Sequence, residues 1–304
     1  MRDIIIVGAG PAGLTAGLYG ARARLDVILF EKMTPGGQVL LTDMVENYPG
    51  FPERISGFEL MDRMKRQAEG FGLSIEMREV SGFQFTSEAK TVITDKGEEK
   101  ARAVILACGA TPRKLGIPGE DLLTGKGVSY CATCDGPFYR DLEVAVIGGG
   151  DTAVEEALFL TKFATRVYLI HRRDQLRATK ILQERVIGND KVQIIWDTIP
   201  VRILGENGVE AIELKNVKTS QVITLKVQGV FIFIGYEPNT QLVKGLLDLD
   251  PLGFIKTDDE MQTSVPGVFA AGDIRSKNLR QISTAVGDGA TAAFSAEKYL
   301  ESGA

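Results

Sequence analysis

The sequence predicts an α/β protein in which one strand–turn–helix–strand unit occurs twice. Each copy contains a short apolar strand, a glycine-rich turn, a helical stretch and a second apolar strand. Gly8 precedes Glu31 by 23 positions in the first copy, and Gly148 precedes His171 by 23 positions in the second. β-Branched strands in this order are typical of a buried parallel sheet with helices on its faces. The equal spacing indicates that one architecture is used twice.

The first copy consists of strand 4–7, turn 8–13 (GAGPAG), helix 14–23 and strand 26–30, followed at once by Glu31. A G-x-G-x-x-G turn between a strand and a helix is typical of a dinucleotide-binding Rossmann unit. A pyrophosphate would lie at the helix N-terminus, where free N–H groups and the helix dipole favour an anion. The alternative is a glycine-rich turn that binds nothing.

The residue types within this turn each have a reason. Gly8 permits the tight turn, Gly10 lets the backbone approach a pyrophosphate, and Gly13 allows close packing of helix and strand. Glu31 is placed to accept a hydrogen bond from a ribose hydroxyl. The complete unit therefore predicts a nucleotide site.

The second copy consists of strand 144–147, turn 148–153 (GGGDTA), helix 154–162 and strand 166–170. It differs from the first copy in charge, because the position of the acid is taken by a basic run, HRR, at residues 171–173.

This difference predicts two different ligands. A carboxylate such as Glu31 suits a free 2′-hydroxyl and repels a 2′-phosphate, whereas guanidinium groups bind that phosphate through charge-assisted hydrogen bonds. The first site therefore fits FAD or NAD, and the second, with Arg172, Arg173 and Arg177, fits NADPH. A solvated basic turn is the alternative for the arginines. His171 is explained equally well as a ligand residue or as a structural residue at a strand end.

The composition favours a globular protein over a nucleic-acid-binding or membrane protein. The 304 residues suffice for two domains or one large one, and 44% apolar with 25% charged residues indicates an ordinary globular protein. The net charge of −5 provides no basic surplus for nucleic acid. Five glycines and a proline interrupt the apolar first 20 residues, so we expect neither a signal peptide nor a membrane segment there, and a cytoplasmic location.

The chain contains three cysteines, of which Cys131 and Cys134 form a C-x-x-C pair. Three cysteines are too few for a disulfide framework, so the pair indicates redox or metal chemistry. A zinc site needs about four ligands, and only Cys108 and His171 remain to supply sulfur or nitrogen. We therefore expect no metal. Cys108 is interpreted as a small buried residue at a strand end.

Over almost its whole length the chain resembles the low-molecular-weight thioredoxin reductases, of the class II pyridine nucleotide-disulfide oxidoreductase family. The motifs that carry the resemblance are GAGPAG (8–13), GGQ (36–38), ENYPG (46–50), CATCDG (131–136), GGGDTA (148–153), HRRD (171–174) with Arg177 and Ala178, and FAAGD (269–273). Two departures are visible: Cys108 stands where relatives often carry Thr, and residues 39–41 (VLL) replace a Thr-rich stretch.

The resemblance implies two Rossmann-like three-layer domains, with an NADPH domain inserted into an FAD domain. Residues 1–112 and 238–304 would form the FAD domain, and residues 113–237 the NADPH domain, which would also carry the redox dithiol. The crossings near residues 111–114 and 236–239 would act as a hinge, because dithiol and NADPH must reach the same flavin in turn. A homodimer is also implied.

The resemblance further implies an NADPH-dependent thioredoxin–disulfide reductase. Electrons would pass from NADPH through FAD to a Cys131–Cys134 disulfide and then to thioredoxin. Cys134 would face the flavin, Cys131 would attack the partner, and Asp135 would act as general acid, unless it is only an exposed turn carboxylate. The expected FAD residues are Gly8, Gly10, Pro11, Ala12, Gly13, Glu31, Gly37, Gln38, Asn47, Val80, Gly109, Gly272, Asp273, Arg280, Gln281 and Ile282. The expected NADPH residues are Gly148, Gly149, Gly150, Asp151, Thr152, His171, Arg172, Arg173, Arg177 and Gly235.

Three alternatives stay open at this point. The same flavoenzyme could reduce a glutaredoxin-like protein or a peroxide-reducing system. A ferredoxin–NADP⁺ reductase of similar architecture would lack the dithiol, so Cys131 and Cys134 count against it. A non-catalytic redox sensor would bind NADPH and FAD without turnover.

Overall fold

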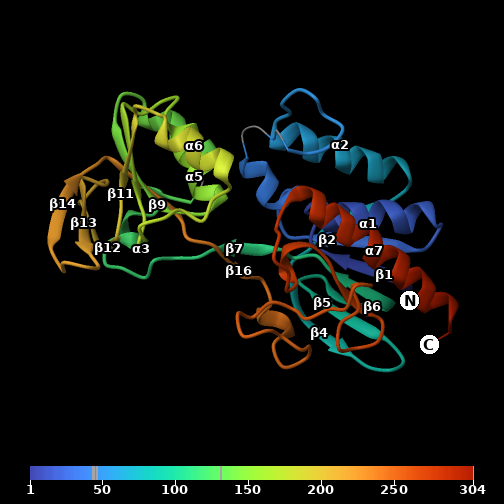
Figure 1. Cartoon of the computed structure of the whole chain (residues 1–304). Helices are drawn as coiled ribbons and strands as arrows, with labels where there is room; N and C mark the ends of the chain where they lie inside the picture. The colour runs from blue at the N-terminus through green and yellow to red at the C-terminus, as the bar shows by residue number, and fades with distance from the viewer. Residues whose placement is uncertain (43–44, 46, 131, 304) are drawn as a thin grey trace. The chain divides into compact units, whose positions relative to one another are not determined.

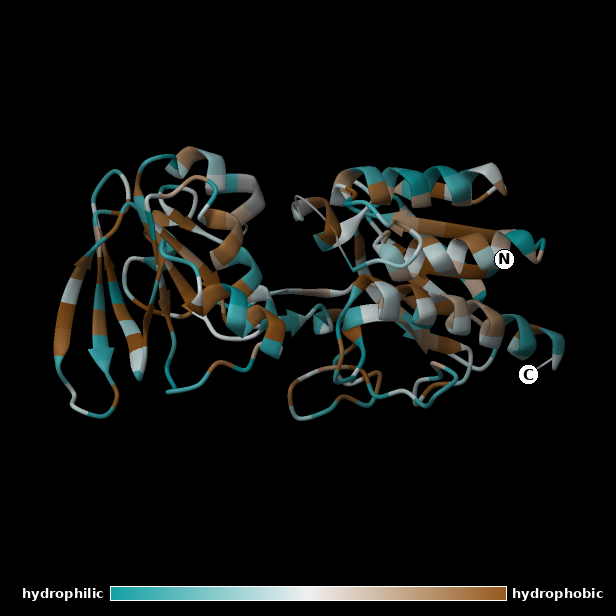
Figure 2. Ribbon diagram, turned by 45° about the horizontal axis from the view of Figure 1, so that its top comes forward, coloured by the Kyte–Doolittle hydropathy of each residue, from teal (hydrophilic) through white to brown (hydrophobic). Residues whose placement is uncertain are grey.

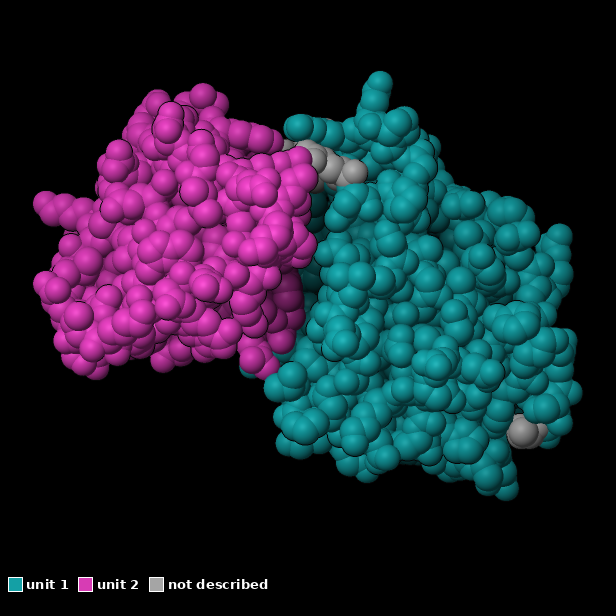
Figure 3. Space-filling model, in the orientation of Figure 1, with its two compact units in different colours: residues 1–111, 237–304 teal, residues 112–236 magenta. Residues whose placement is uncertain are grey.

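The computed structural model describes residues 1–42, 45, 47–130 and 132–303. The chain divides into two compact units, which Figure 3 colours separately: unit 1 holds residues 1–111 and 237–304, and unit 2 holds residues 112–236. Unit 2 is therefore an insertion into unit 1. Both boundaries lie one residue before the positions expected from the sequence.

Unit 1 is organised around a seven-stranded sheet with the order β3-β2-β1-β6-β5-β4, in which β17 also pairs with β6. Strands β1, β2, β3, β6 and β17 pair in parallel, whereas β4 and β5 are antiparallel to their neighbours. The bounds are β1 (Arg2–Val7), β2 (Val27–Glu31), β3 (Ser74–Met77), β4 (Val80–Phe85), β5 (Lys90–Thr94), β6 (Gly97–Leu106) and β17 (Val268–Ala270).

Side chains of β1 alternate between two buried layers, as expected of a central strand. Ile4 and Ile6 join a core with helices α1 (Pro11–Arg22), α2 (Gly57–Gly70) and α7 (Ile282–Glu301). Ile5 and Val7 join a second core on the opposite face, with residues from β4, β5 and the C-terminal part of the unit. Helices α1 and α7 lie side by side (Figure 1). The described part of the unit also contains the short helices η1 (Gly37–Leu41), η3 (Gln241–Val243) and η4 (Gly272–Ile274).

Unit 2 has a five-stranded parallel sheet, β11-β10-β9-β15-β8, and a separate three-stranded antiparallel sheet, β12-β13-β14. The bounds are β8 (Val128–Ser129), β9 (Glu143–Gly148), β10 (Arg166–Ile170), β11 (Val192–Ile195), β12 (Thr198–Leu204), β13 (Ala211–Asn216), β14 (Val222–Lys226) and β15 (Gly229–Phe233).

The parallel sheet of unit 2 is covered on both faces. One core packs it against α5 (Asp151–Leu160) and α6 (Lys180–Ile187), and the other packs it against the three-stranded sheet and α3 (Glu120–Leu123). Figure 2 shows these strands as predominantly hydrophobic, as burial on two faces requires. The remaining elements are α4 (Ala132–Asp135) and η2 (Gly136–Tyr139).

The two chain crossings pair with each other. Strands β7 (Ala110–Pro112) and β16 (Tyr236–Pro238) form a two-stranded sheet, and each ends at its proline. The N–H of Arg113 donates to the carbonyl of Gly235 at 2.9 Å, and the N–H of Asn239 donates to the carbonyl of Gly109 at 3.0 Å. The sequence indicated the crossings but not their pairing.

Helices α1 and α5 both begin three residues earlier than the sequence pattern indicated. Gly10 and Gly150 are the N-cap residues, so the last residues of each glycine-rich turn already form the first helical turn. Among the residues that the structure describes, no helix combines the length and apolar character that a bilayer crossing needs.

Candidate cofactor sites and redox centre

The first glycine-rich turn connects β1 to α1 in the way that the motif predicts. Gly8 has φ of 103°, and a Cβ there would lie 2.5 Å from the carbonyl oxygen of Ala107. A Cβ on Gly13 would overlap the carbonyl oxygen of Gly8. Gly10 differs, because a Cβ there would meet no atom within 4 Å. Two glycines are thus needed for packing, and Gly10 leaves open space beside the N-terminus of α1.

Glu31 binds two backbone N–H groups beside this open space. Its Oε2 accepts from the N–H of Ala9 at 2.8 Å, and its Oε1 accepts from the N–H of Met33 at 3.0 Å. A carboxylate has about four acceptor sites, so Glu31 can still accept from a ribose hydroxyl. The start of η1 also approaches the turn, since a Cβ on Gly37 would lie 3.2 Å from Cα of Gly10. Gln38, next in the chain, is exposed.

The C-terminal part of unit 1 meets the same helix start. A Cβ on Gly272 would lie 2.9 Å from Cβ of Ala12, in the first turn of α1 after Pro11. Oδ1 of Asp273 is buried and makes no hydrogen bond among the described residues. Burial raises the pKa of this carboxyl above its ordinary value, against the opposing effect of Lys277 and Arg280. This buried acceptor lies 3.6 Å from Nζ of Lys277 without a hydrogen bond, so it can still accept from a hydroxyl such as those of the ribityl part of FAD.

The N-terminus of α7 carries three more of the expected FAD residues, Arg280, Gln281 and Ile282. Gln281 is its N-cap residue, and Oε1 of Gln281 also accepts from Nδ2 of Asn47 at 3.0 Å, across 234 positions of sequence. Arg280 stacks on the Phe254 ring, with its guanidinium carbon 4.0 Å from the ring centre, and its Nε is buried without a hydrogen bond to any described residue. Ile282 begins the helix.

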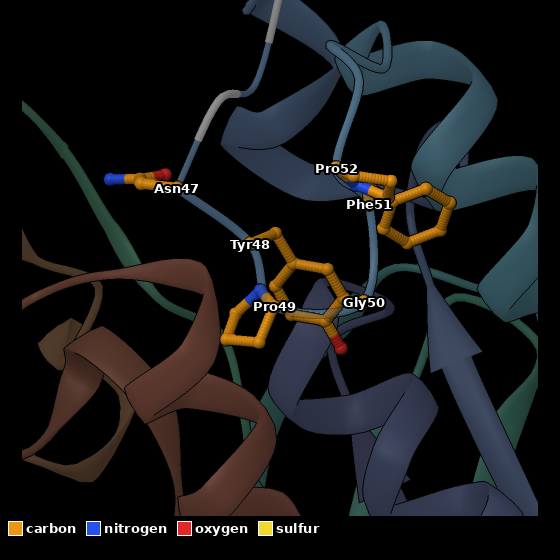
Figure 4. Close-up of a pocket in the computed structure, with 6 residues that line it drawn as sticks. All are labelled: Asn47, Tyr48, Pro49, Gly50, Phe51 and Pro52. Carbon is orange, nitrogen blue, oxygen red and sulfur yellow. The ribbon is translucent and has the colours of Figure 1, made fainter.

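An open hollow of about 490 Å³ lies at the Asn47 loop. Figure 4 shows the Asn47 side chain pointing away from the rings of Tyr48 and Phe51. The lining residues are Asn47, Tyr48, Pro49, Gly50, Phe51 and Pro52. Glu46, which belongs to the same motif, lies outside the described residues.

Two other expected FAD residues lie further along the sheet. Gly109 follows β6 and has φ of 65°, which favours glycine. Val80 begins β4, three residues after Met77, and Met77 pairs in register with Glu31. Val80 therefore lies near the strand end that carries Glu31.

The second glycine-rich turn repeats the pattern of the first. A Cβ on Gly148 would overlap the carbonyl oxygen of Phe233, at the end of β15, and a Cβ on Gly150 would meet no atom within 4 Å. Asp151 and Thr152 lie in the first turn of α5, and Oδ1 of Asp151 accepts from the N–H of Thr179 at 2.6 Å. The space beside Gly150 is again open at a helix N-terminus.

His171 lies directly beneath this turn. A Cβ on Gly149 would overlap the imidazole ring, and Nδ1 lies 3.0 Å from the carbonyl oxygen of Gly148. Because a carbonyl can only accept, Nδ1 carries the proton, which leaves Nε2 as an acceptor; it is buried and unpartnered among the described residues. Burial lowers the pKa of His171, which favours the neutral ring. This geometry supports the structural interpretation of His171.

The three arginines lie in the exposed segment that follows β10 and returns to the turn. The N–H of Arg177 donates to the carbonyl of Gly149 at 2.7 Å, which folds residues 172–178 back onto the turn. Arg172, Arg173 and Arg177 are exposed, and their side chains pair with no residue that the structure describes. Gly235 has φ of 109° and lies two residues after Phe233, which pairs in register with Gly148 of the turn.

The dithiol segment follows β8. Cys131 lies outside the described residues, and Cys134 is placed in α4 by its backbone. Asp135 lines a hollow of about 230 Å³ with Lys126, Phe138 and Tyr139. Phe138 is 78% exposed although it is aromatic. Cys108 packs in unit 1, where burial raises the pKa of its thiol to about 12.

Sequence reasoning missed two buried carboxylates. Asp288, on α7, binds the N–H of Gly272, and Glu120 binds the segment before the dithiol through Tyr130. Neither belongs to a quoted motif, and their partners lie 16 and 10 positions away. Within the described part of the chain, no three His, Cys, Asp or Glu side chains gather as metal ligands.

Comparisons with known proteins agree with this geometry. The family model described as pyridine nucleotide-disulphide oxidoreductase matches residues 2–289. The chain is 52% identical to a thioredoxin reductase of Peptoclostridium litorale, over 98% of this chain and 97% of that protein, and 48% identical to one of Streptomyces coelicolor, over 99% and 94%. The crystal structure of Lactococcus lactis thioredoxin reductase in the FR conformation has a TM-score of 0.97 at 46% identity, covering 99% of this chain and 100% of that one.

The two Rossmann-type units, the insertion of one into the other and the resemblance along the full length lead to one assignment. The chain belongs to the pyridine nucleotide-disulphide oxidoreductase family and, within it, to the low-molecular-weight thioredoxin reductases.

Proposed function

We propose that this chain uses NADPH to reduce the disulfide of thioredoxin, with FAD and the Cys131–Cys134 pair as internal carriers. One observation carries the proposal: the chain builds the same open glycine turn twice, with an acid beside one and three exposed arginines in the segment that returns to the other. A dinucleotide without a 2′-phosphate suits the first turn, and NADPH suits the second.

Unit 1 would hold FAD through the α1 start, Glu31, Asp273 and the residues before α7. Bound FAD would supply two-electron chemistry between a nicotinamide and a disulfide. Unit 2 would hold NADPH through the α5 start and its three arginines. In this scheme His171 supports the second turn from below and does not touch the phosphate.

The thiols would carry the last stage. With the pair reduced, the Cys131 thiolate would attack one sulfur of the partner's disulfide, forming a mixed disulfide and releasing the other partner sulfur as a thiolate. Cys134 would then attack Cys131 in that mixed disulfide, which closes the Cys131–Cys134 bond and frees the partner as a dithiol. Asp135, beside Tyr139 in its hollow, would give a proton to a leaving thiolate.

The paired crossings support the proposed hinge. Strands β7 and β16 are the two covalent connections between the units, and each is three residues long. A change of φ and ψ at these few residues would turn unit 2 as a body, so that dithiol and NADPH could face the flavin alternately. We further propose a cytoplasmic homodimer.

Spectroscopy of the purified protein tests this proposal. The protein should be yellow with flavin absorbance bands, NADPH should bleach them without air, and oxidised thioredoxin should restore them. A colourless protein that takes up no FAD would overturn the proposal. Restoration by an oxidised glutaredoxin-like protein but not by thioredoxin would assign a different acceptor.

A further inference from the structure

The carboxylate of Asp288 is the centre of a buried charge cluster in unit 1. Its Oδ2 accepts from the N–H of Gly272 at 3.0 Å and from Nζ of Lys277 at 2.8 Å, and its Oδ1 accepts from Nη1 of Arg275 at 3.0 Å. The three charged side chains are only 10–13% exposed. A carboxylate with three donors, two of them cations, fixes the loop between β17 and α7.

Lys277 lies between two carboxylates and makes a hydrogen bond to one of them. Its Nζ is 2.8 Å from Oδ2 of Asp288, whereas it is 3.6 Å from Oδ1 of Asp273, close enough for an ion pair but too far for a hydrogen bond. Nζ also donates to Oγ1 of Thr284 at 3.3 Å. Asp288 and Thr284 both belong to α7, so the helix holds the ammonium group on its own side.

The consequence falls on Asp273. Its Oδ1 is buried and makes no hydrogen bond to any described residue, although an ammonium group with three donors lies within 4 Å. A buried acceptor usually binds such a donor. Here the ammonium makes its hydrogen bond to Asp288, so the Asp273 oxygen keeps only the longer ion pair and can still accept a hydrogen bond.

We propose that Asp288 is a positioning residue of the FAD site: it holds the Lys277 ammonium away from Asp273, so that Oδ1 of Asp273 stays open to a hydroxyl of the cofactor. The proposal rests on the assignment of FAD to unit 1. Without the Asp288 charge, Lys277 needs to move by less than 1 Å to bond Asp273, since 3.6 Å must shorten only to about 2.8 Å. The cofactor would then compete with an internal ammonium for one oxygen.

The test compares FAD affinity in full-length variants, measured as the flavin fluorescence released when purified holoprotein is diluted. Asp288→Asn keeps the shape and an acceptor for Gly272 but removes the charge. We expect FAD to bind this variant about tenfold or more weakly, the loss that one charged hydrogen bond represents. The double variant Asp288→Asn with Lys277→Met should return to within about threefold of the wild type.

Rescue by the second substitution separates competition from simple loosening of the loop. If Asp288 only anchored the loop, removing Lys277 as well would leave the affinity low, and that result would overturn the proposal. Lys277→Met alone keeps the Asp288 bonds to Gly272 and Arg275 and should bind FAD like the wild type. Weakened FAD binding in that single variant would show that Lys277 contacts the cofactor, and this also overturns the proposal, even if Asp288→Asn fails to fold.

Failure of this proposal can be distinguished from failure of the proposed function. A wild-type protein that binds no FAD contradicts the function. If the wild type and Asp288→Asn bind FAD equally tightly, that result contradicts only the proposed role of Asp288.

Discussion

Tyr130, the residue before Cys131, donates its hydroxyl hydrogen to Oε1 of Glu120 at 2.7 Å. Glu120 is 2% exposed and also accepts from the N–H groups of Leu115 and Gly116 at 2.8 and 2.6 Å. One buried carboxylate thus connects residues 115–116, which follow β7, to Tyr130, which precedes the dithiol. Burial and this bond raise the pKa of Tyr130 far above its usual value, so the phenol stays protonated as the donor.

Replacing Glu120 by Ala should therefore destabilise unit 2. The N–H groups of Leu115, Gly116 and Ile117 and the Tyr130 hydroxyl lose their acceptor, which should lower the free energy of unfolding by about 3 kcal/mol. Tyr130→Phe removes one of these bonds and should cost only about 1 kcal/mol. Urea denaturation of the three proteins gives both values, and equal losses would mean that Glu120 acts through Tyr130 alone.

His171 should make stability depend on pH in a definite direction. Burial lowers its pKa in the folded protein, with Arg177 and Arg173 acting the same way. As the pH falls, the unfolded chain takes up the proton first, at about pH 6.5. The stability that the neutral ring contributes is therefore complete above that pH and is lost as the pH falls through the lower folded-state pKa.

Two measurements check this. His171 is the only histidine of the chain, so its NMR signals are unambiguous and should titrate below the usual range, with the proton of the neutral ring on Nδ1. His171→Gln should lose less stability than the wild type between about pH 7 and pH 5.5. Titration of the ring at or above its ordinary pKa would contradict the burial argument.

The sequence sufficed for the two nucleotide turns because each depends on contacts within one βαβ unit. The position of each glycine in the turn, the strands on either side and the charge at the end of the second strand are local properties, and the structure agrees with them. The helix starts were misplaced by three residues, since a glycine N-cap leaves no capping side chain to recognise.

The unpredicted part consists of contacts between distant segments. Asn47 meets Gln281 across 234 positions, and β7 pairs with β16 across more than 120 residues, with no pattern in either segment that names its partner. Asp288 lies in a helix where a single acid resembles any surface acid until α7 is placed against Gly272. The role of such carboxylates can be recognised only in the folded chain, where their hydrogen-bond donors are in place.

Arg177→Glu should change the choice between the two nicotinamide cofactors. Reversing the charge beside the second turn replaces attraction for the 2′-phosphate by repulsion, so NADPH affinity should fall about 100-fold while NADH affinity changes by about threefold or less. Fluorescence titration with each cofactor measures both. Arg185→Glu, an exposed site on α6 with the same change of charge, is the matched control. Equal losses for NADPH and NADH would remove the 2′-phosphate assignment from Arg177.

Cys134→Ser should separate the two halves of the reaction. NADPH should still bleach the flavin absorbance, because the nucleotide turns are untouched, whereas reduction of thioredoxin should fall by about 1,000-fold or more. Cys108→Ser makes the same change at a thiol that packs against the carbonyl of Val7 and should keep most of the turnover. Thioredoxin reduction that persists in Cys134→Ser would place the reducing thiol elsewhere.

Two glycines of the first turn should respond in opposite ways to the same substitution. A methyl group on Gly10 projects into open space, and its φ of −74° suits any residue, so Gly10→Ala should cost the FAD-free protein about 1 kcal/mol or less. It should nevertheless weaken the binding of FAD by about tenfold or more, because the methyl group occupies the space where the pyrophosphate would approach.

A methyl group on Gly13 overlaps the carbonyl of Gly8, so Gly13→Ala should lower the free energy of unfolding by about 3 kcal/mol even without FAD. Denaturation without the cofactor, followed by FAD titration, distinguishes a residue kept for the ligand from one kept for the fold; a Gly10→Ala protein with full FAD affinity would move the pyrophosphate away from the start of α1.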